Sequence, residues 1–193
     1  MDLKYLAISN IGPFKGLHQF HFNTTSGKNG FAIFSKNGRG KTSLFNAMQW
    51  ALFGEVFERG SVRSGRWSDG RKRTIVGDYS KNPGPMMNQD AYREMRIPEM
   101  NVIIIATQNG KDIQINRVAR SRVGSMPRVD DDLNQNLTVT IGKEVAQDAK
   151  GQELVENLFP NELRRFFFID GESLEEYVDL VKAGQVGGIK DDV

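Results

Sequence analysis

The chain has 193 residues, with 26 Lys and Arg against 24 Asp and Glu, which gives a net charge of +2. It is therefore not a polycation overall, and any contact with nucleic acid must come from a local basic patch. The absence of cysteine excludes disulfides and cysteine-ligated zinc and favours a reducing cytoplasm. No apolar run is long enough to cross a bilayer, so we expect no membrane partner.

The N-terminal segment predicts three strands. Residues Leu3–Asn10 and Leu17–Phe22 alternate apolar and polar side chains, as half-buried strands do, and the turn between them carries Phe14 as a buried aromatic residue. The apolar run Gly30–Ser35 predicts a third strand, which leads directly into a glycine-rich loop.

That loop is typical of a phosphate-binding P-loop at the start of a helix. Gly38 and Gly40 allow backbone conformations that a side chain disfavours, and successive N–H groups can hold a triphosphate at the positive end of the helix. Lys41 would place a positive charge on the outer phosphates, and the Thr42 hydroxyl would bind Mg²⁺. The predicted nucleotide-binding residues of the loop are Lys36, Asn37, Gly38, Arg39, Gly40, Lys41, Thr42 and Ser43.

One position departs from the full P-loop pattern. The pattern begins with glycine, and this chain has Ser35 there. The alternative is an ordinary glycine-rich turn between a strand and a helix. That alternative leaves the placement of Lys41 and Thr42 at the helix start unexplained, so we favour nucleotide binding.

The helix after the loop is predicted over Ser43–Gly54. Leu44, Met48 and Leu52 recur at helical spacing, and a glycine ends the segment. We assign the aromatic residue Trp50 on this helix to core packing rather than to base stacking.

Residues 55–98 predict an irregular insertion rich in Gly, Pro, Arg and Asn. Basic residues gather between Arg59 and Lys81, with Trp67 and Tyr79 among them, and such a segment can hold a nucleic-acid backbone. A solvated loop without that role is an equal alternative. The candidate nucleic-acid contacts are Arg63, Arg66, Arg71, Lys72 and Arg73.

A β-hairpin follows the insertion. Met100–Gln108 and Asp112–Arg120 flank Asn109 and Gly110, a pair that favours a tight hairpin turn. The apolar run Val102–Ile105 predicts a strand buried on both faces. The remaining predictions here are a solvated loop over 121–135, whose acidic run Asp130–Asp132 we do not assign to a metal site, a strand over Asn136–Ile141 and a helix over Gln152–Phe159.

The last informative segment lies near the C-terminus. Arg165–Ile169 predicts a buried strand that ends at Asp170, before a charged helix over Ser173–Lys182. A carboxylate at the end of such a strand, beside a P-loop, can reach Mg²⁺ through water and orient a nucleophile. The alternative is a plain Asp-Gly turn that precedes a helix. Because a P-loop is also predicted, we favour Asp170 as a metal-binding and catalytic residue, together with Lys41 as a catalytic residue.

Three of these segments carry a resemblance to a known family. Leu6–Phe14 resembles the first strand and turn, and Asn37–Gly54 the Walker A loop and helix, of ABC-type ATPase heads of the SMC-like group, which includes double-strand-break-repair, RecF-like and RecN-like ATPases. Leu158–Glu172 is similar to the Phe-rich Asp-Gly-Glu motif of DndD-like and Lamassu-type ATPases of bacterial phage defence. The resemblance implies an α/β P-loop NTPase fold, with a mixed or antiparallel sheet around the Walker A helix.

The resemblance also implies ATP and Mg²⁺ as cofactors, and it places Asp170 where relatives contact Mg²⁺ and the attacking water. It implies that Lys15, after the first turn, approaches the nucleotide and that Arg63 reaches it from beyond the Walker A helix. Residues 1–193 would form the N-terminal lobe of a head, with the basic insertion at 55–98. The chain has no Walker B or signature motif, so we expect the coiled coil and the C-terminal lobe to be absent from it.

We therefore expect the ATP-binding half of an SMC-like ATPase that acts on DNA in bacterial phage defence or DNA repair. Two complete heads would clamp ATP between them, and hydrolysis would reopen them, so this lobe alone should be inactive. The expected partners are DNA, a second head and a nuclease or effector subunit, in the bacterial cytoplasm. The alternative is a nucleotide-gated DNA-binding and oligomerisation module without productive hydrolysis.

Overall fold

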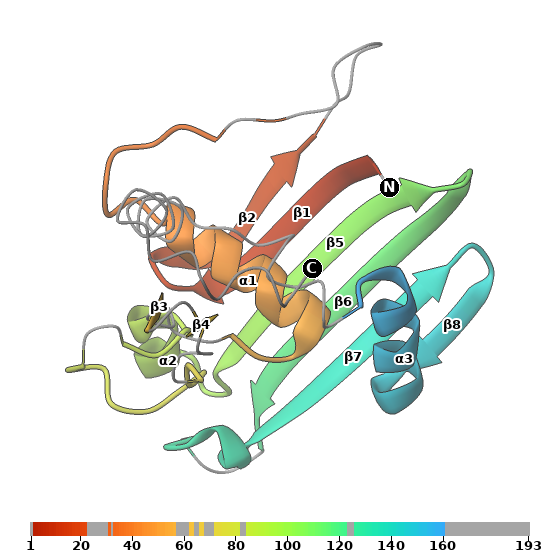
Figure 1. The fold of residues 1–193 in the computed structure, drawn as a ribbon. Coiled ribbons are helices and arrows are strands. Elements are labelled where there is room, and N and C mark those ends of the chain that lie inside the picture. Colours follow the sequence, from red (N-terminus) through yellow and green to blue (C-terminus); the bar gives the residue numbers. More distant parts are fainter. Residues whose placement is uncertain are drawn as a thin grey trace.

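The structure is a computed structural model that describes residues 2–22, 31, 33–56, 62–63, 66–67, 72–81, 84–122 and 126–160 (Figure 1). Its centre is an antiparallel six-stranded sheet in the order β2-β1-β5-β6-β7-β8. The strands of this sheet are β1 (Asp2–Ile11), β2 (Phe14–His21), β5 (Glu99–Gln108), β6 (Lys111–Ser121), β7 (Leu133–Ile141) and β8 (Glu144–Gln147). The other elements are α1 (Lys41–Phe53), α2 (Gln89–Glu94), α3 (Asp148–Leu158), a 3₁₀ turn (Asp130–Asp132) and a short pair of strands, β3 (Val62–Arg63) and β4 (Arg66–Trp67).

Most of the elements predicted from local signals are confirmed. The β5–β6 hairpin turns at Asn109 and Gly110, whose φ angles are 51° and 73°, as a tight hairpin turn requires. Helix α1 ends at Gly54, which adopts a left-handed conformation and donates its N–H to the Trp50 carbonyl at 2.8 Å. Helix α3 begins at Asp148, four residues before the predicted start, and β8 was not predicted.

The core lies between one face of the sheet and helices α1 and α3, both of which cross that face (Figure 1). Trp50 on α1 is 1% exposed, which confirms its assignment to the core. It packs among Leu6 and Ile8 of β1 and the alternate residues of β5 that point to the same side. The helix that carries the glycine-rich loop is therefore fixed to the centre of the sheet.

Arg117 of β6 holds the C-terminal end of α1. Its guanidinium donates from Nε to the Ala51 carbonyl at 3.0 Å and from Nη2 to Oε1 of Gln152 on α3 at 2.6 Å. Burial lowers the pKa of Arg117 to about 10, so the group remains charged at neutral pH. A cation at this end of a helix donates hydrogen bonds to the last carbonyls and interacts favourably with the negative end of the helix dipole.

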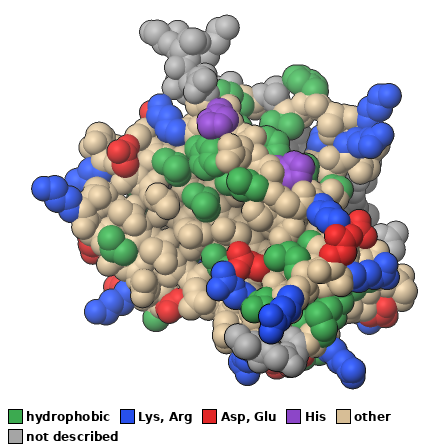
Figure 2. All heavy atoms as spheres, turned by 180° about the vertical axis from the view of Figure 1, so that it is seen from behind, with side chains coloured by type: hydrophobic (Ala, Val, Ile, Leu, Met, Phe, Trp, Pro, Cys, Tyr) green, Lys and Arg blue, Asp and Glu red, His purple; other side chains and the backbone are tan. Residues whose placement is uncertain are grey.

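The opposite face of the sheet is open among the described residues, and Figure 2 shows mainly apolar and uncharged polar side chains in its middle. Val102 and Ile104 are buried in the core, whereas Ile103 and Ile105 point to this second face and are only partly buried. The prediction that Val102–Ile105 is buried on both faces is therefore wrong. The run is apolar throughout, but the helices of the described residues cover one side of the sheet.

The predicted strand over Gly30–Ser35 is also corrected. Gly30 and Ala32 lie outside the described residues, and Phe31 and residues 33–36 have no strand structure. A strand requires a backbone hydrogen-bonding partner, and within the described ranges no neighbouring strand pairs with this segment. The apolar pattern alone could not reveal that.

The predicted irregular insertion at 55–98 is partly a packed element. Ile75, Val76, Met86 and Met87 are each at most 3% exposed and belong to the core. Met86 and Met87 donate their N–H groups to the carbonyls of Thr74 and Ile75 at 2.9 Å. Backbone hydrogen bonds therefore connect the two short segments that contribute these four buried side chains. The six-residue helix α2 then leads into β5.

The acidic run at 130–132 is not the solvated loop that we predicted. The Asp130 carboxylate accepts the N–H groups of Ile75 and Val76 at 2.8 and 3.0 Å, and burial raises its pKa. Asp132 accepts N–H groups from Arg128 and Val129 within its own turn. Both carboxylates therefore support the backbone. Within the described ranges no group of three or more acidic or His side chains could hold a metal ion, and no helix is long and apolar enough to span a membrane.

Candidate functional site

The loop at 36–40 adopts the backbone that its glycines were predicted to allow. Gly38 and Gly40 have φ angles of 75° and 94°, in the left-handed region, and Gly40 is the N-cap residue of α1. The first α-helical hydrogen bond runs from the Leu44 N–H to the Gly40 carbonyl at 2.8 Å. Residues 33–39, Lys41 and Thr42 are exposed to solvent, and Gly40 is partly buried.

Lys41 closes this loop. Its ammonium donates to the carbonyl oxygens of Ser35 at 2.8 Å and Lys36 at 3.3 Å, six and five residues earlier in the chain. The Arg39 N–H also donates to the Lys36 carbonyl at 3.3 Å. The loop therefore curves around the ammonium group of Lys41, the first residue of α1.

The N-terminal end of α1 is suited to an anion. No side chain caps this end, and its first turn contains no acidic residue. The first N–H groups of a helix carry a partial positive charge, and Lys41 adds a full charge at the same place. Thr42 is exposed in this turn, where its hydroxyl is available to a magnesium ion that accompanies phosphates. The glycine cradle, the helix N-terminus without an acidic residue in its first turn and the lysine together fit a magnesium-bound nucleoside triphosphate.

Ser35 occupies the first position of the pattern without backbone strain. Among the described residues other than glycine, only Asn10, Asn109 and Asp148 have positive φ angles. Ser35 uses an ordinary conformation, and its contribution to the loop is the carbonyl that accepts from Lys41. A glycine is therefore not required at this position.

We predict that Ser35→Gly changes ATP affinity by less than about twofold, because the carbonyl that contacts Lys41 is kept. The variant should unfold slightly more easily, by about 0.5 kcal/mol, since glycine raises the entropy of the unfolded chain. Calorimetric titration with ATP and a thermal melt check the two effects. A large gain in affinity would show instead that Ser35 distorts the site.

The turn between β1 and β2 forms the floor of the loop, and sequence reasoning did not identify this role. A Cβ on Gly40 would lie 2.7 Å from the Phe14 ring and 2.8 Å from Pro13 Cγ, and a Cβ on Gly12 would lie 2.4 Å from Ser43 Oγ. Residues 12–14 therefore touch both Gly40 and Ser43. The signal in the sequence is the glycine at each point of contact. Its meaning can be recognised only when the β1–β2 turn is known to lie against the glycine-rich loop.

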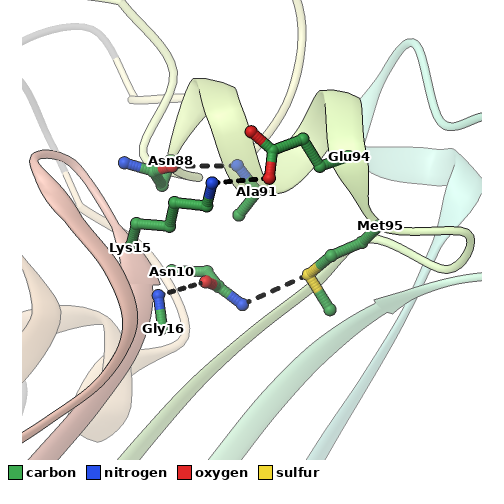
Figure 3. A network of polar contacts seen from close by, with 7 residues as sticks. All are labelled: Asn10, Lys15, Gly16, Asn88, Ala91, Glu94 and Met95. Atoms are coloured by element: carbon green, nitrogen blue, oxygen red, sulfur yellow. Dashed lines mark hydrogen bonds and ion pairs between the residues drawn. The ribbon is translucent and has the colours of Figure 1, made fainter.

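Lys15 is not held at the loop in this structure. Its ammonium lies 2.5 Å from Oε2 of Glu94 on α2, and the hydrogen bond to that carboxylate raises the pKa of Lys15 (Figure 3). Both side chains are exposed, so the pair contributes little to stability. An approach of Lys15 to nucleotide would require it to leave Glu94, and that role stays a prediction.

The five candidate nucleic-acid contacts do not share one structural setting. Arg63 and Arg66 belong to the short strands β3 and β4, and Arg71 lies outside the described residues. Lys72 is exposed and forms an ion pair with Glu55 at 3.4 Å, while Arg73 donates to the Gly84 carbonyl at 2.6 Å. Contacts with DNA by these five residues stay a prediction.

Tyr79, an aromatic residue of the same segment, packs inward. Its ring lies against Tyr92 of α2, with ring centroids 5.1 Å apart, and burial raises the pKa of its hydroxyl. Tyr92 in turn donates its hydroxyl to the Pro127 carbonyl at 2.7 Å. These rings therefore join the insertion to α2 and to the 126–132 segment.

Asp170 lies outside the described residues, and so do the strand and helix predicted around it. Its catalytic and metal-binding roles stay predictions. Lys41 and Thr42 are the only two residues predicted for catalysis or metal binding that the described part of the chain contains.

A helix that follows a glycine loop, with a glycine at its N-cap and a lysine folded into the loop, is typical of a P-loop protein. A comparison with family models agrees: the family described as AAA domain matches residues 5–184. The chain belongs to this family of P-loop ATPases, which supports ATP binding, with Mg²⁺ as the usual companion of ATP. A comparison with curated proteins found no match.

Proposed function

We propose that this chain is the ATP-binding part of an SMC-like ATPase head that acts on DNA in bacterial phage defence or DNA repair. The observation that carries the proposal is the formed P-loop, in which Lys41 closes a glycine loop at a helix end that has no acidic residue. The family match supports the ATPase class. The assignment to SMC-like heads rests on the motifs at both ends of the sequence.

Within this proposal, each loop residue has a defined task. Backbone N–H groups of the loop and of the first turn of α1 hold the phosphates, and Lys41 moves from the loop carbonyls onto the outer phosphates. The Thr42 hydroxyl, assisted by Asp170, would hold Mg²⁺, which neutralises charge on the phosphoryl group that is transferred. Hydrolysis then requires a carboxylate from the remainder of a complete head.

An exposed apolar segment supports the idea of a larger head. Phe31, Ile33 and Phe34, immediately before the P-loop, are 46%, 48% and 91% exposed. Phe34 in particular is a large apolar side chain that gains free energy when it leaves water. We infer that this segment packs against another part of a complete head, or against the second head of an ATP-bound dimer.

Anisotropy measurements with labelled ATP and labelled DNA test the proposal. We expect the chain to bind ATP in the presence of Mg²⁺, and DNA to bind more tightly when ATP is present. DNA binding that ignores ATP and weakens steeply with salt would favour the alternative, a DNA-binding and oligomerisation module without productive hydrolysis. A failure to bind ATP would contradict both.

A further inference from the structure

The buried side chain of Asn88 is hydrogen-bonded to the β1–β2 turn, which forms the floor of the P-loop. Asn88 is 7% exposed, and its Nδ2 donates to the Gly12 carbonyl at 2.7 Å. Its Oδ1 accepts the Ala91 N–H at 2.9 Å and so caps the start of α2 (Figure 3). Its backbone N–H also donates to the Asn10 carbonyl at 2.8 Å. One residue therefore connects α2 to the β1–β2 turn through three hydrogen bonds.

Further hydrogen bonds fix the same β1–β2 turn. The Gly12 N–H donates to the Met86 carbonyl at 2.8 Å, so residues 86–88 hold both backbone polar groups of Gly12. The side chain of Asn10, a residue with a φ angle of 58°, accepts the Gly16 N–H at 2.8 Å (Figure 3). The same side chain donates to the Glu99 carbonyl at 2.9 Å. The position of the turn is therefore determined by the end of the insertion as much as by its own strands.

The turn has little freedom to move without disturbing the loop. Gly12 approaches Ser43 so closely that a single added methyl group would clash, and Pro13 and Phe14 make the same close approach to Gly40. Gly40 and Ser43 are residues whose N–H groups would face the phosphates. Protein interiors are close-packed, so a shift of the floor is transmitted to the groups that rest on it.

We propose that Asn88 is a positioning residue for the phosphates of the nucleotide, acting through residues 12–14 on Gly40 and Ser43. The inference rests on the proposed ATP-binding function and deepens it. The end of the insertion and the start of α2 then belong to the support of the nucleotide site.

Asn88→Ser tests this role, because serine caps helices well but is too short to reach the Gly12 carbonyl while it does so. We expect the variant to fold and to bind ATP about tenfold more weakly, since small misplacements of binding groups are costly. Asn88→Asp is the second variant. Its carboxylate can still cap α2 but cannot donate to Gly12, so the same loss of affinity is expected from an independent change.

A matched control separates positioning from general destabilisation. Val139→Ala removes a fully buried side chain from β7, the fifth strand in the order of the sheet, away from the turn. It should lower the melting temperature at least as much as Asn88→Ser, yet change ATP affinity less than about twofold when measured well below the melting temperature. That contrast is a result that a merely structural role for Asn88 would not produce.

The inference is overturned if both Asn88 variants bind ATP as the unmodified chain does. It is also overturned if all three variants lose affinity in proportion to their loss of melting temperature. The unmodified chain and Lys41→Ala serve as references in the same titration. If the unmodified chain binds no ATP, or Lys41→Ala binds it normally, the proposed function fails. If these references behave as expected and the Asn88 variants do not, only the positioning role fails.

Discussion

Gly40→Ala should both destabilise the protein and abolish ATP binding. Alanine at a φ angle of 94° is strained, and the new methyl group would lie 2.7 Å from the Phe14 ring and 2.8 Å from Pro13. Together the strain and the overpacking should cost about 3 kcal/mol of the free energy of unfolding. The backbone would have to move at the N-cap of α1, which is where the phosphates are expected to bind.

Gly38→Ala is the matched control for this change. Gly38 also has a positive φ angle, 75°, but a Cβ there would meet nothing within 4 Å. Only the conformational cost remains, which is about 1 kcal/mol. Denaturant unfolding of both variants therefore measures the contact between the loop and the β1–β2 turn. Equal destabilisation would show that the turn does not support the loop.

Lys41→Ala should weaken ATP binding by at least about a hundredfold, because it removes the charge-assisted contact with the outer phosphates. The melting temperature should change little, since Lys41 is exposed and its hydrogen bonds to Ser35 and Lys36 lie at the surface. Calorimetric titration with ATP and Mg²⁺ checks the affinity.

Lys36→Ala controls for net charge in that experiment. Lys36 is exposed, lies in the same loop and contributes a backbone carbonyl to the Lys41 ammonium. Its removal lowers the charge of the loop equally, and we expect ATP affinity to fall by no more than about threefold, as for a screened surface charge. Similar losses in the two variants would mean that the loop attracts nucleotide through general charge rather than through the placement of Lys41.

The parts of the fold that the sequence predicted correctly are those fixed by local chemistry. Asn109 and Gly110 favour a hairpin turn by themselves, and Gly54 ends α1 because glycine adopts the left-handed cap without a Cβ penalty. The loop around Lys41 could be predicted for the same reason. Its glycines and its lysine act within a few residues of one another.

The parts that were missed depend on contacts between distant segments. Ile75 and Met87 are short apolar signals without helical or strand periodicity, and their burial follows from pairing with each other and from the carboxylate of Asp130. From the sequence alone Asn88 is an ordinary polar residue; its role depends on Gly12 of the β1–β2 turn, 76 positions earlier in the sequence. No local pattern identifies such partners.

The incorrect strand before the P-loop has a related cause. The alternation of apolar residues around Ile33 describes an extended segment, but a strand also needs a neighbour for its backbone, and the described sheet does not supply one. For the same reason, the apolar run Val102–Ile105 predicted burial on both sides of the sheet, whereas the described helices cover one side and leave Ile103 and Ile105 partly buried. Apolar composition indicates what a segment can bury and does not show what covers it.

The central claim is that the loop at 36–43 binds the phosphates of ATP. Backbone amide NMR of the isotope-labelled chain, titrated with ATP and Mg²⁺, tests it most directly. The largest shifts should fall on the amides of Gly38, Gly40, Lys41 and Thr42, because their N–H groups would donate to phosphate oxygens. Unchanged resonances for these four residues at saturating ATP, or shifts confined to another part of the chain, would contradict the account.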